Sequence, residues 1–154
     1  MKHTKSYAFL VGSVMAIVLF ACTKNDEFIN ENVTNTGVGY YPLSANTLVD
    51  MATNSNINNA TYSTGATFRT EIQFISQSPV KEINLYATVG TGMRTKQSTY
   101  PYAPAYSATK GTDTLLVPFT VPTGLNAGTS IRLEYEILNQ NNLNLIRLAT
   151  IRTR

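Results

Sequence analysis

The alternation of apolar and polar residues along four stretches constrains the fold of this chain more than any other feature. The stretches are residues 68–74, 83–89, 115–121 and 131–137. Between 131 and 137, isoleucine, leucine and tyrosine take every second position, and arginine and glutamate fill the positions between them. A period of two places the apolar set on one face of a strand. No stretch after residue 22 has helical spacing, so we predict an all-β domain.

Turn-forming residues separate these stretches and set the expected number of strands. Pro, Gly, Asn, Gln and Ser interrupt the pattern at 77–79, 90–92, 122–124 and 139–142. A last strand is expected near 145–151, and the runs at 40–43 and 48–51 predict a first strand and a covering segment. Pro118 cannot donate to a strand ladder, which indicates an edge position or a bulge. Because each strand has one apolar face to cover, we predict an antiparallel β-sandwich of about six to eight strands.

The length and charge of the chain narrow the classes of partner. A chain of 154 residues has room for one ordinary domain. Its formal net charge is +3, and loss of Lys2 and Lys5 with an export signal leaves roughly +1. The remaining basic residues are scattered, and the late cluster of Arg147, Arg152 and Arg154 fits a solvated strand end. We therefore expect no nucleic acid partner, since phosphate binding needs a concentrated basic stripe.

The first 22 residues have the anatomy of an export signal. Lys2, His3 and Lys5 precede an apolar run at 7–20. That run holds about 14 residues, and a membrane-spanning helix needs about 20, so a permanent span is the weaker alternative. The run ends at Cys22, the only cysteine, so no intrachain disulfide is possible. The alternative role for Cys22 is a buried free thiol.

The segment Leu19-Phe20-Ala21-Cys22 resembles the lipobox of bacterial lipoproteins, although Phe20 departs from the small residue usual at its position. The resemblance implies cleavage before Cys22, lipidation of its sulfur, and a membrane partner through that lipid. The acidic pair Asp26-Glu27 is similar to the export tag of Bacteroidota-type surface lipoproteins. It implies an outer-membrane location on the cell surface, with the periplasmic leaflet as the alternative. The expected division is a signal peptide at 1–21, a flexible tether at 22–38, and a domain at 39–154.

The corners at 78–81 and 125–129 resemble those of the immunoglobulin-like domains of Bacteroidota surface lipoproteins. The resemblance covers about 66–154 and implies an immunoglobulin-like sandwich. The cysteine and tryptophan hallmarks of antibody domains are absent from the sequence. Fold likeness of this kind does not give a function.

The sequence contains few residues in arrangements that support catalysis. His3, the only histidine, lies in the expected signal, which excludes histidine-based triads and histidine-ligated metals from the mature chain. Aspartates are too far apart in sequence to indicate a calcium site, so we expect no metal and no cofactor. Glu134 and Glu136 share one strand face and leave a glycoside hydrolase open as an alternative. Beside Arg132 they fit an ordinary solvent-exposed face.

A connection rich in tyrosine and proline at 99–106 is the main candidate for a ligand-contact loop. Its residues Tyr100, Tyr102 and Tyr106 offer rings that can stack on sugar faces. Arg94 and Lys96, with Lys110, can frame a polar or anionic ligand. The alternative is that the tyrosines cover a sheet edge while the prolines discourage strand addition.

Two further expectations complete the functional reading. The run Asp113-Thr114-Leu115 resembles the O-glycosylation signal of Bacteroidota envelope proteins and makes Thr114 a possible acceptor. The chain as a whole is expected to be a non-catalytic envelope lipoprotein, a surface accessory or binding module that captures glycan or protein. The alternative is a structural or assembly component of an outer-membrane transporter or appendage.

Overall fold

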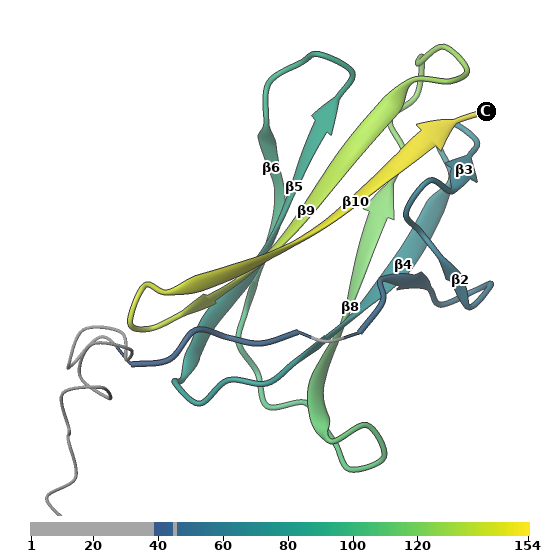
Figure 1. The fold of residues 1–154 in the computed structure, drawn as a ribbon. Coiled ribbons are helices and arrows are strands. Elements are labelled where there is room, and N and C mark those ends of the chain that lie inside the picture. The colour runs from purple at the N-terminus through teal and green to yellow at the C-terminus, as the bar shows by residue number, and fades with distance from the viewer. Residues whose placement is uncertain (1–38, 45) are drawn as a thin grey trace, which may run out of the picture. The chain divides into compact units, whose positions relative to one another are not determined.

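The computed structural model describes residues 39–44 and 46–154, where the chain forms ten strands and no helix (Figure 1). Six strands are long: β4 (Thr67–Phe74), β5 (Val80–Val89), β6 (Thr95–Pro101), β8 (Thr112–Thr120), β9 (Ser130–Asn139) and β10 (Asn144–Thr153). Four have two residues each: β1 (Val49–Asp50), β2 (Ser55–Asn56), β3 (Thr61–Tyr62) and β7 (Tyr106–Ser107). The all-β prediction is confirmed. The predicted number of six to eight strands was too low, because strands of two residues are too short to show an alternating pattern.

The expected signal peptide, tether and lipidated Cys22 lie outside the described residues. Within the described ranges, no helix has the length and hydropathy of a membrane span.

The strands form two sheets of five that pack face to face. Sheet 1 has the order β2-β1-β4-β8-β7, and sheet 2 has the order β3-β10-β9-β5-β6. All pairs are antiparallel except β3 and β10, where Thr61 lies opposite Arg152 in a parallel pair. The prediction of a purely antiparallel sandwich was wrong at this pair. The segment before β3 runs beside β10 in the same direction, with the Asn59 amide donating to the Thr150 carbonyl at 2.6 Å.

The buried residues confirm the alternation seen in the sequence. The apolar residue at every second position of β4, β5, β8 and β9 faces the space between the sheets. Ile72, Val117, Leu133 and Ile137 have no exposed surface. Burying a side chain of this size stabilises the fold by about 1.5–3 kcal/mol. Alternation therefore assigned the core correctly on both sheets.

Pro118 lies at a position of β8 where its missing amide hydrogen breaks no backbone hydrogen bond to a neighbouring strand. It pairs with Arg69 of β4 on one side, in a ladder without a bulge. On its other side, β7 pairs with β8 only at Asp113 and Thr112, so no described strand reaches Pro118. Of the two explanations for this proline, the edge position is confirmed.

The segment before β1 departs from the predicted first strand. Only Leu43 makes a bridge there, with Ile75, through two backbone hydrogen bonds of 2.8 Å. Side chains hold the rest, because the Tyr40 carbonyl accepts a hydrogen bond from the Asn139 side chain at 3.0 Å. Leu43 and Tyr41 are more than half exposed, and Pro42 between them is buried. The run therefore has an inward position, but it pairs with a neighbouring segment only at Leu43.

Candidate functional site

The predicted tyrosine loop is shorter than expected, because much of it is strand. Tyr100 and Pro101 close β6, where Tyr100 pairs with Ile83 of β5. Tyr106 opens β7 on the other sheet. Only residues 102–105 remain as the connection between β6 and β7. The prolines suggested a loop, but an edge strand accepts proline at its end, and Pro101 takes that place.

The three tyrosines do not form one platform. Tyr100 and Tyr102 are partly buried and pack against the core. The Tyr102 ring meets Phe74 edge-on at 6.3 Å between centroids, and its hydroxyl donates to Asp113 at 3.3 Å. Tyr106 is 69% exposed. Only one of the three rings is therefore freely available to a ligand.

Arg94 and Lys96 lie apart from those tyrosines, on the outer face of sheet 2. The Arg94 guanidinium carbon lies 3.3 Å from the centroid of the Tyr86 ring, and the Lys96 ammonium lies 5.4 Å from it. Side chains from β5, β6 and β9 join them in what we call the outer-face network. Its members are Asn84, Tyr86, Arg94, Lys96, Arg132, Glu134 and Glu136.

Glu134 lies at the base of this network and is only 5% exposed. Arg94 Nε contacts one of its carboxylate oxygens at 2.8 Å, and an Arg132 terminal nitrogen contacts the other at 3.3 Å. Partial burial lowers the pKa of Arg94, but the hydrogen bond and charge of Glu134 outweigh it and raise that pKa overall. The two guanidinium groups therefore hold and cover one carboxylate. This differs from the solvent-exposed face expected for Glu134, because Arg94 folds back over it from the β5–β6 turn.

Asn84 links the network across the sheet and is 1% exposed. Its amide nitrogen donates to Glu136 at 3.0 Å, and its amide oxygen accepts from Lys96 at 3.1 Å and from Thr99 at 2.7 Å. A buried amide satisfied on both sides is a fixed element of the surface.

Glu136 is held ionised by its neighbours. Partial burial acts to raise the pKa of Glu136. Hydrogen bonds from Asn144 at 2.7 Å, Asn84 at 3.0 Å and Tyr86 at 3.2 Å act to lower it and together outweigh burial, so the pKa is lowered overall. A glycosidase needs one carboxylic acid whose pKa is raised so that it can protonate the leaving group. Glu136 has the opposite tuning, and both oxygens of Glu134 are engaged by arginine. The arrangement suits binding better than acid catalysis.

Asn84 and Tyr86 were not among the predicted site residues. Both occupy polar positions of the alternating stretch 83–89, so the pattern predicts that they face outward. What gives them neighbours is strand register, with Asn84 opposite Glu136 and Tyr86 opposite Glu134. A rule that aligns the outward polar positions of adjacent strands would have found them.

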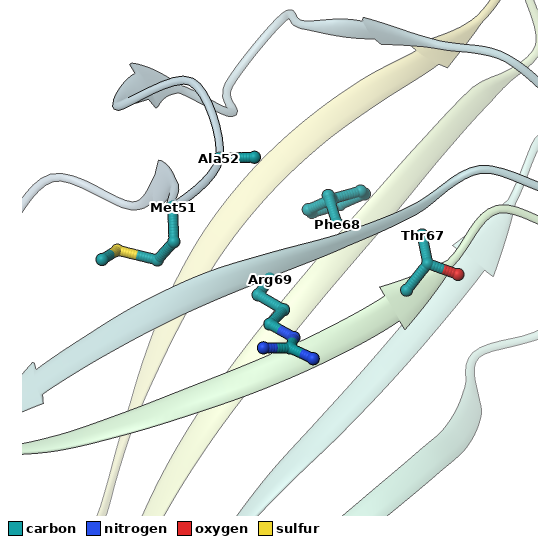
Figure 2. Close-up of a pocket in the computed structure, with 5 residues that line it drawn as sticks. All are labelled: Met51, Ala52, Thr67, Phe68 and Arg69. Atoms are coloured by element: carbon teal, nitrogen blue, oxygen red, sulfur yellow. The ribbon is translucent and has the colours of Figure 1, made fainter.

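A hollow of about 470 Å³ opens on the opposite side of the sandwich, near the turn that follows β1. Figure 2 shows Met51 and Ala52 on that turn, across from Thr67, Phe68 and Arg69 on β4. Its one charged lining residue is Arg69, and its floor is the nearly buried Phe68. The hollow brings together no set of polar groups comparable to the outer-face network.

The other predicted positions carry less chemistry. Thr114 is half-buried in β8, and its amide donates to the Ala105 carbonyl at 3.0 Å. Lys110 does not join Arg94 and Lys96, because its ammonium pairs with Glu71 on sheet 1 at 2.5 Å. Within the described ranges, no three His, Cys, Asp or Glu residues gather as metal ligands would.

Comparison with known proteins gives no family. No family model matches the chain, and no curated protein matches it. Among solved structures, an AA10 lytic polysaccharide monooxygenase from Streptomyces lividans is 17% identical with a TM-score of 0.42. The match covers 66% of this chain and 61% of the monooxygenase, so this chain spans less than two thirds of that protein.

Two other solved structures share similarity of the same low degree. A Niemann-Pick type C2 protein from the Japanese carpenter ant is 11% identical over 61% of this chain and 79% of its own, with a TM-score of 0.40. The archaeal flagellum of Methanospirillum hungatei strain JF1 is 16% identical over 92% of this chain and 86% of its own, with a TM-score of 0.37. None of these similarities carries an inference about function.

Proposed function

We propose that this chain is a non-catalytic binding module of the bacterial cell envelope, anchored by a lipid on Cys22, that captures its ligand on the outer face of sheet 2. The observation that carries the proposal is the outer-face network. Asn84 and Glu134 are almost fully buried there, although they lie on the outward side of a sheet. Ordinary outward positions of a strand are solvated, and fixing such groups in place costs side-chain entropy. A preorganised polar surface lowers the cost of binding.

Several features of the chain support the rest of this assignment. The signal anatomy ending at Cys22 supports lipid attachment, export and an outer-membrane location on the cell surface. Two packed sheets of five strands support an immunoglobulin-like sandwich as the finer fold class. The lone histidine in the expected signal, and the lowered pKa of Glu136, support a role without catalysis.

The binding proposal is tested with the lipoprotein purified in detergent from cell membranes. We expect it to bind glycans on an array, or one constant protein in a pull-down, and to lose at least tenfold in affinity in Tyr86→Ala and Arg94→Ala. Arg69→Gln on sheet 1 is the matched control and should bind as the parent does. Unchanged binding in both network variants would overturn the assignment of this face. Glycoside turnover that disappears in Glu134→Gln would overturn the non-catalytic role.

The anchor is tested separately by metabolic labelling with palmitate. We expect label in the parent and only background label in Cys22→Ser, because the thioether requires the cysteine sulfur. Equal labelling of the two proteins would refute lipidation at this residue.

A structural or assembly role is the second candidate, favoured by the open edge of β10. β3 covers this edge only at Arg152 and Thr153. No described strand pairs with residues 144–149 on that side. Beside this edge, on the outer face of sheet 2, Ile146 is 41% exposed and Leu148 is 53% exposed. Open edges recruit extended segments of other proteins.

The other long edge of sheet 2 is better protected. β6 carries a register shift that leaves Gln97 unpaired, and it ends in Pro101. Bulges and prolines both oppose strand addition. If the second candidate is right, a photo-crosslinker at Leu148 will capture one constant envelope protein in cells, and Arg94→Ala, which alters the outer face away from this edge, will not reduce the capture. A crosslinker at Leu116, exposed on sheet 1, should not capture it, and equal capture at both positions would refute an edge interface.

A further inference from the structure

Cations and carboxylates are separated by depth on the outer face of sheet 2. Arg94, Lys96 and Arg132 are all exposed, whereas Glu134 beneath them is buried. In the ion pairs, the Arg94 and Arg132 side chains keep 42% and 55% of their surface, while Glu134 keeps 7%. Glu82 and Glu136, the remaining carboxylates of this face, are half-buried. Of the charged groups on this face, a ligand approaching the sheet therefore meets the cations before the carboxylates.

The hydrogen-bonding groups that remain unused on this face are also donors rather than acceptors. Both oxygens of Glu134 and both oxygens of Glu136 already accept hydrogen bonds or ion pairs. Arg94 uses Nε for Glu134, and Lys96 uses one contact, to Asn84. A guanidinium has five N–H donors and an ammonium has three. The donors left over can satisfy an anionic acceptor, and the planar arginine fork matches the two oxygens of a carboxylate or a phosphate.

These cations form a row that crosses the strands obliquely, because Arg152 lies opposite Ser130, two residues along β9 from Arg132. Lys96 is on β6, and the Arg94 guanidinium lies over Tyr86 of β5. Arg132 is on β9 and Arg152 is on β10, on the side opposite the buried Ala149, Ile151 and Thr153. Figure 1 shows the strands in the order β10-β9-β5-β6. Each of these four neighbouring strands thus carries or lies beneath one exposed cation. Neighbouring strands are about 4.8 Å apart.

A row of this kind matches a polymer whose negative charges repeat at short intervals. A linear polyuronate carries one carboxylate on every ring and presents hydroxyl groups between them. Tyr86, Thr99 and Asn144 place a phenol, a hydroxyl and an amide beside the row, which suit those hydroxyls. An acidic peptide would add along a strand edge, whereas this row runs across the strands.

We infer that the outer face of sheet 2 is a site for an acidic polysaccharide, with Arg94, Lys96, Arg132 and Arg152 binding successive carboxylates. The inference rests on the proposed binding function and names the chemical class of its ligand. Arg94 and Arg132 are already fixed in place by Glu134, so they lose little freedom when they bind.

The test compares three polymers on the detergent-purified lipoprotein by isothermal titration calorimetry. The polymers are polygalacturonate, its fully methyl-esterified form, and poly-glutamate. We expect polygalacturonate to bind at least tenfold more tightly than the other two, and we expect added salt to weaken that binding. Arg132→Gln combined with Arg152→Gln should weaken it at least tenfold.

Controls keep a folding defect apart from a binding defect. Arg152 is exposed, and its side chain has no hydrogen bond or ion pair with another described residue, so Arg152→Gln alone should keep the parent melting temperature and still weaken binding severalfold. Arg69→Gln on sheet 1 removes the same charge and should bind as the parent does. An unchanged affinity in folded Arg152→Gln combined with Arg132→Gln would overturn the site.

The remaining outcomes separate this inference from the proposed function. Equal binding of the ester and the acid would mean a neutral glycan ligand, which overturns the inference while the binding module stands. Equal binding of poly-glutamate would overturn the polysaccharide class in favour of acidic peptide. If no polymer binds and Tyr86→Ala still abolishes capture of a protein partner, the inference fails alone. If both readouts are negative, both proposals fail.

Discussion

The hydroxyl groups of Tyr135 and Thr70 meet at 2.9 Å inside the apolar core, and both side chains are fully buried. Tyr135 belongs to β9 of sheet 2 and Thr70 to β4 of sheet 1, so this hydrogen bond joins the two layers. Burial raises the pKa of Tyr135, while the hydrogen bond from Thr70 lowers it less. The Tyr135 phenol is therefore harder to ionise than a free tyrosine.

Removing one hydroxyl of the Tyr135–Thr70 pair should lower the free energy of unfolding more than removing both. Tyr135→Phe leaves the Thr70 hydroxyl buried without a partner, and we expect a loss of about 1–3 kcal/mol in the free energy of unfolding. Adding Thr70→Val removes the orphaned hydroxyl and should recover most of that loss. Urea unfolding of the two single variants and the double variant gives the coupling energy. Additive losses would show that the two hydroxyls do not interact.

The core was predictable from the sequence because burial follows a period of two within each strand. Ile131, Leu133 and Ile137 needed no knowledge of their partners to be assigned inward. The parallel pair of β3 and β10 was not predictable, since Thr61 and Arg152 are distant in sequence and β3 has only two residues. Local pattern carries no information on such a contact.

The candidate site was only half predictable, for the same reason. Arg94 and Lys96 were assigned to the ligand from their charge, and the tyrosines were joined to them because they are close in sequence. The fold separates them: Tyr102 turns toward Phe74 in the core, while Arg94 turns onto Tyr86. Glu134 and Arg94 are brought together by the pairing of β5 with β9, which the sequence pattern does not reveal.

Two tyrosines of the segment predicted as a ligand-contact loop should differ in how much their truncation to alanine destabilises the fold. Tyr102→Ala removes the ring contact with Phe74 and the hydrogen bond to Asp113, and we expect a loss of about 2 kcal/mol. Tyr106→Ala removes a side chain that is 69% exposed and should change stability by less than about 0.5 kcal/mol. Thermal unfolding of both variants checks this, and equal losses would contradict the different placement of the two rings.

Glu71 should make the stability of the domain depend on acid pH. Burial acts to raise its pKa, but hydrogen bonds from Lys110 and Gln73 and the charge of Lys110 lower it below its ordinary value of 4.5. The stabilising contribution is therefore complete above that value and is lost as the pH falls through the lowered pKa of the folded state. Lys110→Gln should cost about 1 kcal/mol at neutral pH and show a smaller loss on acidification than the parent.

The exposed Lys81 supplies the control for that measurement. Lys81→Gln removes the same charge without touching Glu71, so its urea-unfolding free energy should follow the acid dependence of the parent. An identical acid dependence in Lys110→Gln and in the parent would show that the ion pair does not shift Glu71.

Tyr62 should make the stability of the domain fall at alkaline pH. Its ring stacks on Phe68 at 4.2 Å between centroids, and its hydroxyl donates to Asp50 at 3.2 Å. Burial, the negative charge of Asp50 and that hydrogen bond raise the pKa of Tyr62 to about 12. A raised folded-state pKa means that the contribution is complete below the ordinary value of about 10 and is lost as the pH rises through about 12. The parent should therefore lose on the order of 2 kcal/mol more than Tyr62→Phe between about pH 9 and pH 11.5. Taking the difference between the two proteins cancels the titration of lysines and of the other tyrosines, and parallel curves would mean that Tyr62 ionises in the folded protein as it does in the unfolded chain.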